Sequence, residues 1–184
     1  MRSTSLRCVG GTIGLLACLA SVGSAQGNRG YEIGGDAAFQ HMESKAGGVT
    51  ASQNVLSLPL SSVRVAFPTS GPFEPELSAS LTYVTAGGRS TSNFSGDLGL
   101  LTELSGDPKG PRWFVRPAIG WQRSTTTNAR TFSRATIGAG IGVRLAITER
   151  VAMRYEARYT YLAEEQGISG NVLGLLAGFS VFTR

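Results

Sequence analysis

Apolar and polar residues alternate along most of this chain, and the pattern is clearest between Trp113 and Trp121. Every second residue of that stretch is apolar, and the opposite face carries Arg116 and small residues. A strand rises about 3.3 Å per residue, so the two indoles lie about 26 Å apart on one face. With a tilt of about 40° they are about 20 Å apart along a membrane normal, close to the apolar band between the aromatic girdles of an outer-membrane barrel.

The same period of two recurs in eight segments, and no helical period competes over a comparable length. Pro59 leaves the start of the second segment poorly defined, because proline cannot donate a ladder hydrogen bond. Pro117 lies inside the fifth segment, where we expect a local bulge or a bound water for the same reason. The predicted strands cover residues 31–41, 55–67, 73–85, 91–104, 112–123, 132–146, 151–161 and 171–182.

Two kinds of connection alternate between these segments. Residues 68–72, 105–111 and 148–150 form tight, turn-rich connections. The other connections are mostly longer and rich in Ser, Thr, Gly and Asn, and they cover residues 42–54, 86–90, 124–131 and 162–170. Outer-membrane barrels have short periplasmic turns and longer external loops. The sequence therefore predicts periplasmic termini, with loops 42–54 and 162–170 facing outward.

The N-terminal 25 residues have the composition of a secretory signal. Arg2 and Arg7 precede a short apolar core, and small residues end at Ala25. The apolar core is too short to span a bilayer as a helix. A weak lipoprotein-box pattern ends at Cys18, so lipidation there is an alternative, but we favour a signal that continues to Ala25. The mature chain is then a single domain over residues 26–184.

Composition excludes several classes of function. Cys8 and Cys18 both lie in the predicted signal, so the mature chain has no thiol for a disulfide or a metal. It retains 15 basic and 12 acidic residues, and no basic run with interleaved aromatic residues indicates nucleic acid. No apolar stretch beyond the signal approaches the length of a helical span. Membrane crossing would therefore require a closed barrel, in which every backbone polar group has an internal partner.

The size of the apolar side chains indicates which face points outward. An eight-stranded barrel encloses room for modest side chains or one small ligand. The apolar face carries both tryptophans and many phenylalanines and tyrosines, which would overfill that interior, whereas the polar face is rich in glycine. A soluble ligand-binding barrel with an apolar interior remains the alternative. We expect the apolar face to contact lipid and to form aromatic girdles from Tyr31, Phe39, Phe73, Tyr83, Trp113, Trp121, Tyr155 and Tyr161.

The inward charges are sorted by strand, with acidic residues mainly in the first half of the chain and arginines mainly in the second. Opposite walls of opposite sign can form an ion-pair network, because the planar fork of arginine can hold several carboxylates. We therefore expect a filled lumen, and a polar conduit is the alternative. The predicted network consists of Glu32, Asp36, Arg64, Glu74, Glu76, Asp97, Glu103, Arg116, Arg134, Arg144, Arg154, Glu156 and Arg158.

The stretches Phe114–Trp121 and Arg154–Tyr159, together with the eight alternating segments, resemble the small outer-membrane barrels of the outer membrane protein A and outer membrane protein X type. The resemblance covers almost the whole mature chain. It implies an eight-stranded antiparallel up-and-down barrel, with outer-membrane lipid and the assembly machinery as partners. The final strand of that family commonly ends in phenylalanine, whereas here Thr183 and Arg184 follow Phe182.

No motif indicates an enzyme. His41, Glu43 and Ser44 could suggest a membrane-embedded lipid hydrolase, but one strand end cannot bring a base, an orienting group and a nucleophile together. Glu74 and Glu76 are more simply partners for arginines than an acid/base pair. No metal-ligand cluster or cofactor motif is visible.

The function predicted from the sequence is structural, or an interaction of the outward loops with an unidentified ligand. A narrow channel for ions or small solutes is the first alternative. It would show a conductance in planar bilayers that changes when Arg144 or Glu76 is neutralised. The barrel hydrolase is the second alternative, and it would depend on His41.

Overall fold

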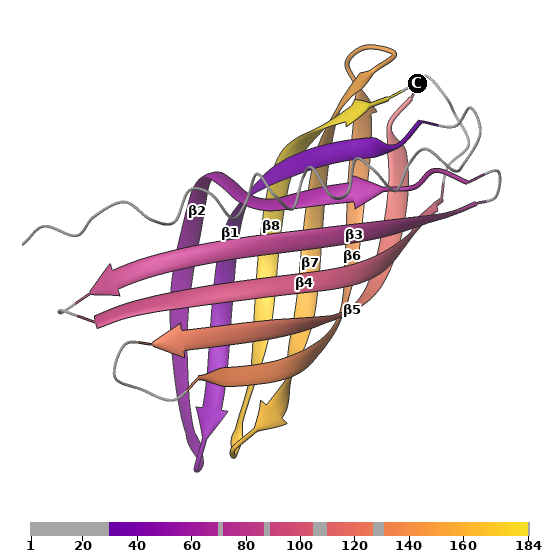
Figure 1. Ribbon diagram of the computed structural model, residues 1–184. Coiled ribbons are helices and arrows are strands. Elements are labelled where there is room, and N and C mark those ends of the chain that lie inside the picture. Colours follow the sequence, from indigo (N-terminus) through magenta and orange to yellow (C-terminus); the bar gives the residue numbers. More distant parts are fainter. Residues whose placement is uncertain (1–29, 70–71, 87–88, 105–109, 127–130, 184) are drawn as a thin grey trace, which may run out of the picture. The chain divides into compact units, whose positions relative to one another are not determined.

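The computed structural model describes residues 30–69, 72–86, 89–104, 110–126 and 131–183, and the predicted signal, residues 1–25, lies outside them. The described part is a set of eight strands joined in chain order (Figure 1). The strands are β1 (Glu32–Ala46), β2 (Val49–Ala66), β3 (Phe73–Ala86), β4 (Arg89–Glu103), β5 (Arg112–Thr126), β6 (Phe132–Ala146), β7 (Val151–Glu165) and β8 (Ile168–Phe182).

Each strand pairs antiparallel with its neighbours in sequence, and β1 pairs with β8 to close the barrel. This closing pair runs from Glu32 opposite Phe182 to Ala46 opposite Ile168 without a register shift. The predicted fold, an eight-stranded antiparallel up-and-down barrel, is confirmed. Among the residues that the structure describes, none forms a helix with the length and apolarity that a membrane span requires.

The outward loops predicted at 42–54 and 162–170 are wrong, because strands continue through most of both ranges. β1 and β2 are joined by Gly47 and Gly48 alone, with φ of 55° and 82°. β7 and β8 are joined by Gln166 and Gly167, with φ of 56° and 78°. Two residues with positive φ form the tight hairpin turn whose twist matches that of antiparallel strands. A search for alternating apolar and polar residues does not detect these strand ends, because polar residues occur on both of their faces.

The predicted contrast between short and long connections is also wrong. At the end of the barrel where β1 starts and β8 finishes, the connections span residues 67–72, 104–111 and 147–150. At the opposite end they span residues 47–48, 87–88, 127–131 and 166–167. The tight hairpins therefore lie at the end opposite the termini, where the strands themselves extend furthest.

A large bulge in β2 surrounds Pro59. Asp36 of β1 lies opposite Ser62, whereas Ala38 lies opposite Ser57, so four residues of β2 face a single residue of β1. The insertion is odd in number, so it moves the inward-facing positions from even numbers in 62–66 to odd numbers in 53–57. This change of phase explains why the alternation could not define the start of the strand, which begins at Val49 rather than Val55.

The bulge predicted at Pro117 is not present. Gly99 lies opposite Ala118 and Thr102 opposite Val115, which is one continuous register, but the pairing of β4 and β5 is interrupted between these positions. On its other side Pro117 lies opposite Ala139 in an unbroken register. The missing N–H of Pro117 therefore leaves a gap in the β4–β5 ladder without moving either strand.

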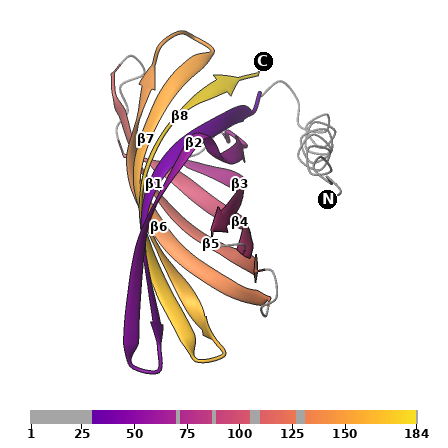
Figure 2. The same ribbon diagram turned by 90° about the vertical axis from the view of Figure 1, so that its left-hand side faces the viewer.

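β2 and β3 form the shortest seam of the barrel. Their opposed residues run only from Ser62 and Ser80 to Ala66 and Glu76. Beyond Ser62, β2 follows β1 toward the Gly47–Gly48 turn, whereas β3 stays with β4 (Figures 1 and 2). The outer parts of β2 and β3 consequently diverge.

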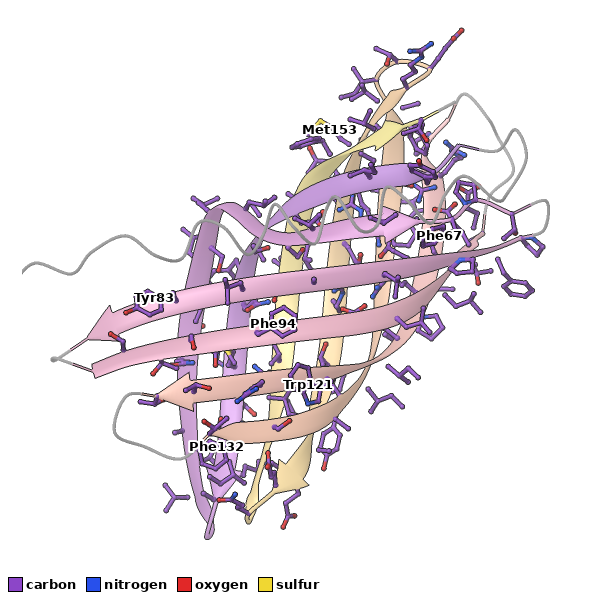
Figure 3. All side chains as sticks on the ribbon, in the orientation of Figure 1. Phe67, Tyr83, Phe94, Trp121, Phe132 and Met153 are labelled. Atoms are coloured by element: carbon purple, nitrogen blue, oxygen red, sulfur yellow. The ribbon has the colours of Figure 1, made fainter. Side chains whose placement is uncertain are left out.

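Large apolar side chains cover the outer wall of the barrel, as the sticks of Figure 3 show for Tyr83, Phe94 and Trp121. Of the aromatic residues predicted for the girdles, Tyr31 precedes β1 and is half-buried. The others are between 39% and 67% exposed, and they are Phe39, Phe73, Tyr83, Trp113, Trp121, Tyr155 and Tyr161. The fully buried side chains lie inside the barrel, and the largest of them are arginines.

Replacing Pro117 by valine should stabilise the barrel. Valine supplies the absent N–H at an outward, β-favouring position, and the restored ladder bond should add about 1 kcal/mol to the free energy of unfolding. Urea titration of the detergent-refolded protein measures this change. The matched control is Ile119→Val, which alters an outward residue on the same strand without changing a donor. An unchanged or lowered stability for Pro117→Val would contradict the account of the ladder gap.

Candidate functional site

The lumen contains two regions, and the first is a cluster of buried charges centred on Glu76 of β3. The Glu76 carboxylate is 0% exposed and forms an ion pair with Arg154 of β7. Its Oε1 lies 2.6 Å from Nε of Arg116 on β5, and its Oε2 lies 3.9 Å from Nε of Arg64 on β2. One carboxylate thus joins three arginines that project from three different strands.

Arg144 of β6 is a second centre of the cluster. Its Nη2 lies 2.7 Å from Glu32 Oε2 and 3.0 Å from Glu74 Oε1, and its Nη1 lies 3.1 Å from Glu103 Oε1. Glu103 also accepts a hydrogen bond of 3.2 Å from Arg112. Arg112 was not among the charges predicted from the sequence, because it stands at the edge of the fifth alternating segment.

Arg64 connects the cluster to β1 and β8. It pairs with Asp36, donates to Ser180 Oγ at 2.6 Å and to the Phe179 carbonyl at 3.2 Å, and lies 3.7 Å from Glu32. Because the pairs cross the barrel rather than run along one strand, the cluster holds the walls of the tube together.

A further chain of ion pairs continues along β7 toward the hairpin end. Glu156 accepts a hydrogen bond of 2.6 Å from Arg154 and one of 2.7 Å from Arg158 Nε. Arg158 Nη1 also lies 3.7 Å from Asp97 Oδ2 on β4, and Asp97 pairs with Arg116. Asp97 and Arg158 form the outer surface of the cluster, with 23% and 17% of their side chains exposed.

Burial makes these pairs obligatory. Arg64, Arg116, Arg144 and Arg154 are at most 2% exposed. An arginine buried without a carboxylate would cost several kcal/mol, and each guanidinium offers five donors that several acceptors can satisfy. Two rings add cation–π contacts, since the Phe114 ring centroid is 4.5 Å from Cζ of Arg154 and that of Phe182 is 5.8 Å from Cζ of Arg144.

Glycines on the inner wall make room for the guanidinium groups. A Cβ at Gly34 would lie 2.5 Å from Nη2 of Arg64, and a Cβ at Gly99 would overlap the Arg116 guanidinium. The inward glycines that distinguish this face in the sequence therefore have a steric role at these positions.

The structure brings together every charge predicted for the lumen except Arg134. Arg134 of β6 forms no ion pair with any described residue, and its buried Nη1 has no hydrogen-bond partner among them. It lies opposite Gln122 of β5, nearer the hairpin end than the rest of the cluster.

The second region of the lumen is a cavity of about 540 Å³ on the hairpin side of Asp97 and Arg158. β3, β4 and β5 contribute a polar wall that includes Ser80, Thr82, Asn93, Ser95 and Gln122. β1, β2, β7 and β8 contribute a mixed wall, in which the apolar residues Met42, Val55, Leu162, Val172 and Leu176 lie among polar ones such as Gln40, Gln53, Ser57 and Thr160. The sequence analysis missed these inward apolar residues. The sequence signal for these residues was their spacing. Leu162 lies two positions from the inward residue Thr160, and Val172 and Leu176 each lie two positions from the inward residue Gly174.

His41 does not belong to either region. Its Nδ1 lies 2.8 Å from Asn54 Oδ1, and its Nε2 lies 3.6 Å from Glu43 Oε1, with both side chains more than two-fifths exposed. Ser44 follows Glu43 on β1 and projects from the opposite face of the strand. The three residues considered for a hydrolase are therefore not assembled into a nucleophile–base pair. Among the described residues, no group of three or more His, Cys, Asp or Glu side chains could hold a metal ion.

The whole barrel is similar to solved outer-membrane barrels. Neisserial surface protein A matches with a TM-score of 0.62 and 13% sequence identity, over 83% of this chain and 97% of that one. The chain has the fold of the small eight-stranded outer-membrane barrels. Ail, the attachment invasion locus protein of Yersinia pestis, matches with a TM-score of 0.53 and 10% identity, over 83% of this chain and 99% of that one. No protein-family model and no curated protein matches the sequence.

Gly99→Ala should destabilise the barrel, because the new methyl group must displace the Arg116 guanidinium from Glu76 and Asp97. We expect a loss of about 1–3 kcal/mol in the free energy of unfolding. The matched control is Gly96→Ala on the same strand, whose Cβ would meet only the Ser78 carbonyl at 3.7 Å. Equal stabilities of the two variants in urea titration would be inconsistent with close packing of Arg116.

Glu76→Gln should have a larger effect. It removes the negative charge that Arg64, Arg116 and Arg154 share and leaves buried positive charge uncompensated, with an expected cost of about 3–5 kcal/mol. Glu43→Gln, which changes an exposed outer-face carboxylate, should alter stability by less than about 0.5 kcal/mol. The fraction folded is measured by the gel migration of unheated samples across a urea series. A Glu76→Gln protein as stable as Glu43→Gln would show that the cluster does not support the fold.

Proposed function

We propose that this protein is an integral outer-membrane barrel with a structural or surface-interaction role and no enzymatic activity. The observation that carries the proposal is the inverted distribution of side chains. Arg64, Arg116, Arg144 and Arg154 are buried inside the tube, whereas Trp113 and Phe73 are each 51% exposed on its outside. A water-soluble barrel would require the opposite arrangement.

The extent of the apolar outer surface supports a lipid partner. Soluble monomers rarely expose contiguous apolar patches of more than a few hundred Å². Here large apolar side chains are exposed on all eight strands, for example Phe39 on β1, Leu98 on β4, Ile119 on β5 and Leu175 on β8. Hydrocarbon on every side of the tube accounts for this pattern, and strand pairing supplies partners to the backbone groups except beside the short β2–β3 seam.

Two levels of aromatic residues support the membrane position. Trp113 and Phe73 lie near the end of the barrel that carries the termini, and Trp121, Phe94 and Tyr161 lie toward the hairpin end. Trp121 and Phe94 contact one another edge to face, with ring centroids 5.9 Å apart. We propose that these levels are the two interfacial girdles. We also propose that the termini are periplasmic, on the ground that the strands extend furthest beyond the girdles at the hairpin end, as the external parts of such barrels do, although the shortest turns lie at that end too.

The end of β8 supports recognition by the outer-membrane assembly machinery through a modified C-terminal signal. Phe179 and Val181 are 57% and 42% exposed on the outer face, whereas Phe182 contacts Arg144. We propose that Phe179 and Val181 supply the outward apolar signal that a terminal phenylalanine supplies in related barrels.

The surface-interaction role rests on the two hairpins that extend furthest from the termini. Residues 49–54 of β2 are all exposed, and the outer ends of β1, β7 and β8 are rich in polar residues. A rigid hairpin presents such residues at low entropic cost. We assign no chemical class to the ligand of this surface. The charge pattern of the surface does not indicate nucleic acid.

The charge cluster supports a closed lumen. Purified protein in planar bilayers should give no steady conductance, because the guanidinium groups and their carboxylates fill the cross-section. Glu76→Gln should remain silent as long as it is folded. A stable single-channel conductance that changes in Glu76→Gln would favour the narrow channel instead.

Fractionation tests the membrane location directly. The chain should sediment with outer membranes, require detergent for release, and migrate differently on gels before and after heating. Recovery of the processed chain in the periplasmic extract without detergent would refute the proposal. Envelope lipid turnover should be the same in cells with the His41→Ala variant as in cells with the unchanged protein. A loss of turnover in the variant would favour the barrel hydrolase instead.

A further inference from the structure

The divergence of β2 and β3 interrupts the barrel wall beside the cavity. Ser62 and Ser80 are the last opposed pair of this seam, and residues 49–61 of β2 and 81–86 of β3 have no strand partner across it. Leu56 and Ser57 from one edge and Ser80 and Thr82 from the other all line the cavity. Both edges of the interruption therefore border the cavity, and no strand pairing closes the wall between them.

The opening begins at the level of the aromatic residues near the hairpin end. Leu81 is the first residue of β3 beyond the seam, and it lies opposite Phe94, the ring that contacts Trp121. Leu81, Leu58 and Leu60 are 57%, 66% and 49% exposed, so the outer rims of the opening are apolar. If Phe94 and Trp121 mark the external interface of the outer membrane, the opening faces the outer leaflet of that membrane at the boundary between headgroups and acyl chains.

Unpaired strand edges at this level require an explanation. In hydrocarbon each backbone polar group without a partner costs several kcal/mol, and irregular backbone at membrane depth occurs where it borders a polar cavity. The polar wall of Ser80, Thr82 and Asn93 lies directly behind the seam. A molecule or water held there can satisfy the strand edges, whereas acyl chains of bulk lipid cannot.

The lining of the cavity combines apolar and polar side chains, as the binding of an amphiphile requires. Met42, Val55, Leu162, Val172 and Leu176 supply its apolar part, and Leu162 and Leu176 are only 5% and 8% exposed. The polar wall that faces them carries hydroxyl and amide side chains. A volume of about 540 Å³ lies within the range of small-molecule sites.

Gln122 of the polar wall and its cross-strand neighbour Arg134, which does not itself line the cavity, each have a buried side-chain atom without a partner among the described residues. Gln122 Oε1 is buried and accepts no hydrogen bond from a described residue, and the buried Arg134 Nη1 donates none to one. These residues lie opposite one another on β5 and β6, and Gln122 lines the cavity. Leaving such groups unsatisfied is costly, and a carboxylate headgroup that accepts from Arg134 would relieve the larger part of the cost, since it pairs with the charged group.

We propose that the opening between β2 and β3 admits a single-chain amphiphile, of the fatty-acid class, from the outer leaflet into this cavity. The acyl chain lies on the apolar residues Leu162, Val172 and Leu176, and the headgroup lies near Gln122 and Arg134. The inference rests on the membrane location proposed above. It concerns binding alone, since the charge cluster closes the route from the cavity to the periplasmic end.

Photolabelling in lipid vesicles tests the inference on the unchanged protein. The probe is a long-chain fatty acid that carries a diazirine in its chain, and the labelled residues are identified by mass spectrometry. Lumenal labels at Val172 and Leu176 should appear and should be competed by excess unlabelled fatty acid. Labels at Leu173 and Leu175, which face outward on the same strand, should appear and resist competition. Labels confined to the outward residues would overturn the inference and leave the membrane location intact, and absence of the outward labels would contradict the membrane location itself.

Closing the opening tests the route. In a chain with Cys8 and Cys18 replaced by serine, Ser57→Cys and Thr82→Cys would be joined by a short, reducible bis-thiol linker. Lumenal labelling should fall at least about tenfold, because entry is blocked, and should return on reduction. The matched control joins Thr91→Cys to Thr126→Cys, whose native hydroxyls already lie 3.0 Å apart across the paired strands β4 and β5. Equal lumenal labelling of the two closed proteins would contradict entry through this seam.

Discussion

Charge burial within a narrow tube is the constraint on which the rest of the structure depends. Glu76 is held by three arginines from three strands, and Arg144 by carboxylates from three others. Such groups tolerate burial only when each has a partner, so they fix which faces of the strands point inward. Period-two alternation then places the large apolar side chains outside. The apolar exterior, the glycine-rich interior and the closed ladder follow from this one arrangement.

The two ends of the lumen differ in the chemistry of their inward side chains. At the end that carries the termini, guanidinium groups and carboxylates pair across the lumen and tie opposite walls together. Toward the hairpins the inward residues become hydroxyls and amides, with leucine, valine and methionine among them on β1, β2, β7 and β8. The bulge around Pro59 and the short β2–β3 seam lie at the same level as this cavity. The largest irregularities of the backbone thus lie beside the cavity, whereas the gap at Pro117 beside the charge cluster leaves the register unchanged.

Much of the fold could be predicted because the signal was local. Residues 134–145 alternate without exception, and β6 has the predicted bounds. The features that escaped prediction depend on relations between strands. The two-residue turns at Gly47–Gly48 and Gln166–Gly167 follow strand ends that are polar on both faces. The phase change in β2 requires a bulge that only pairing with β1 reveals. The apolar residues of the cavity come one or two at a time from four strands, and none of these strands departs from its own pattern enough to be noticed.

The central claim is that the outer face meets hydrocarbon while the charges stay inside, and the two tryptophans allow a direct measurement. Fluorescence of Trp113 and Trp121 in vesicles should be quenched strongly by lipids brominated on their acyl chains and only weakly by iodide in the aqueous phase. Variants that retain one tryptophan, Trp113→Phe and Trp121→Phe, resolve the two levels. Efficient quenching by iodide with little quenching by brominated lipid would contradict the account.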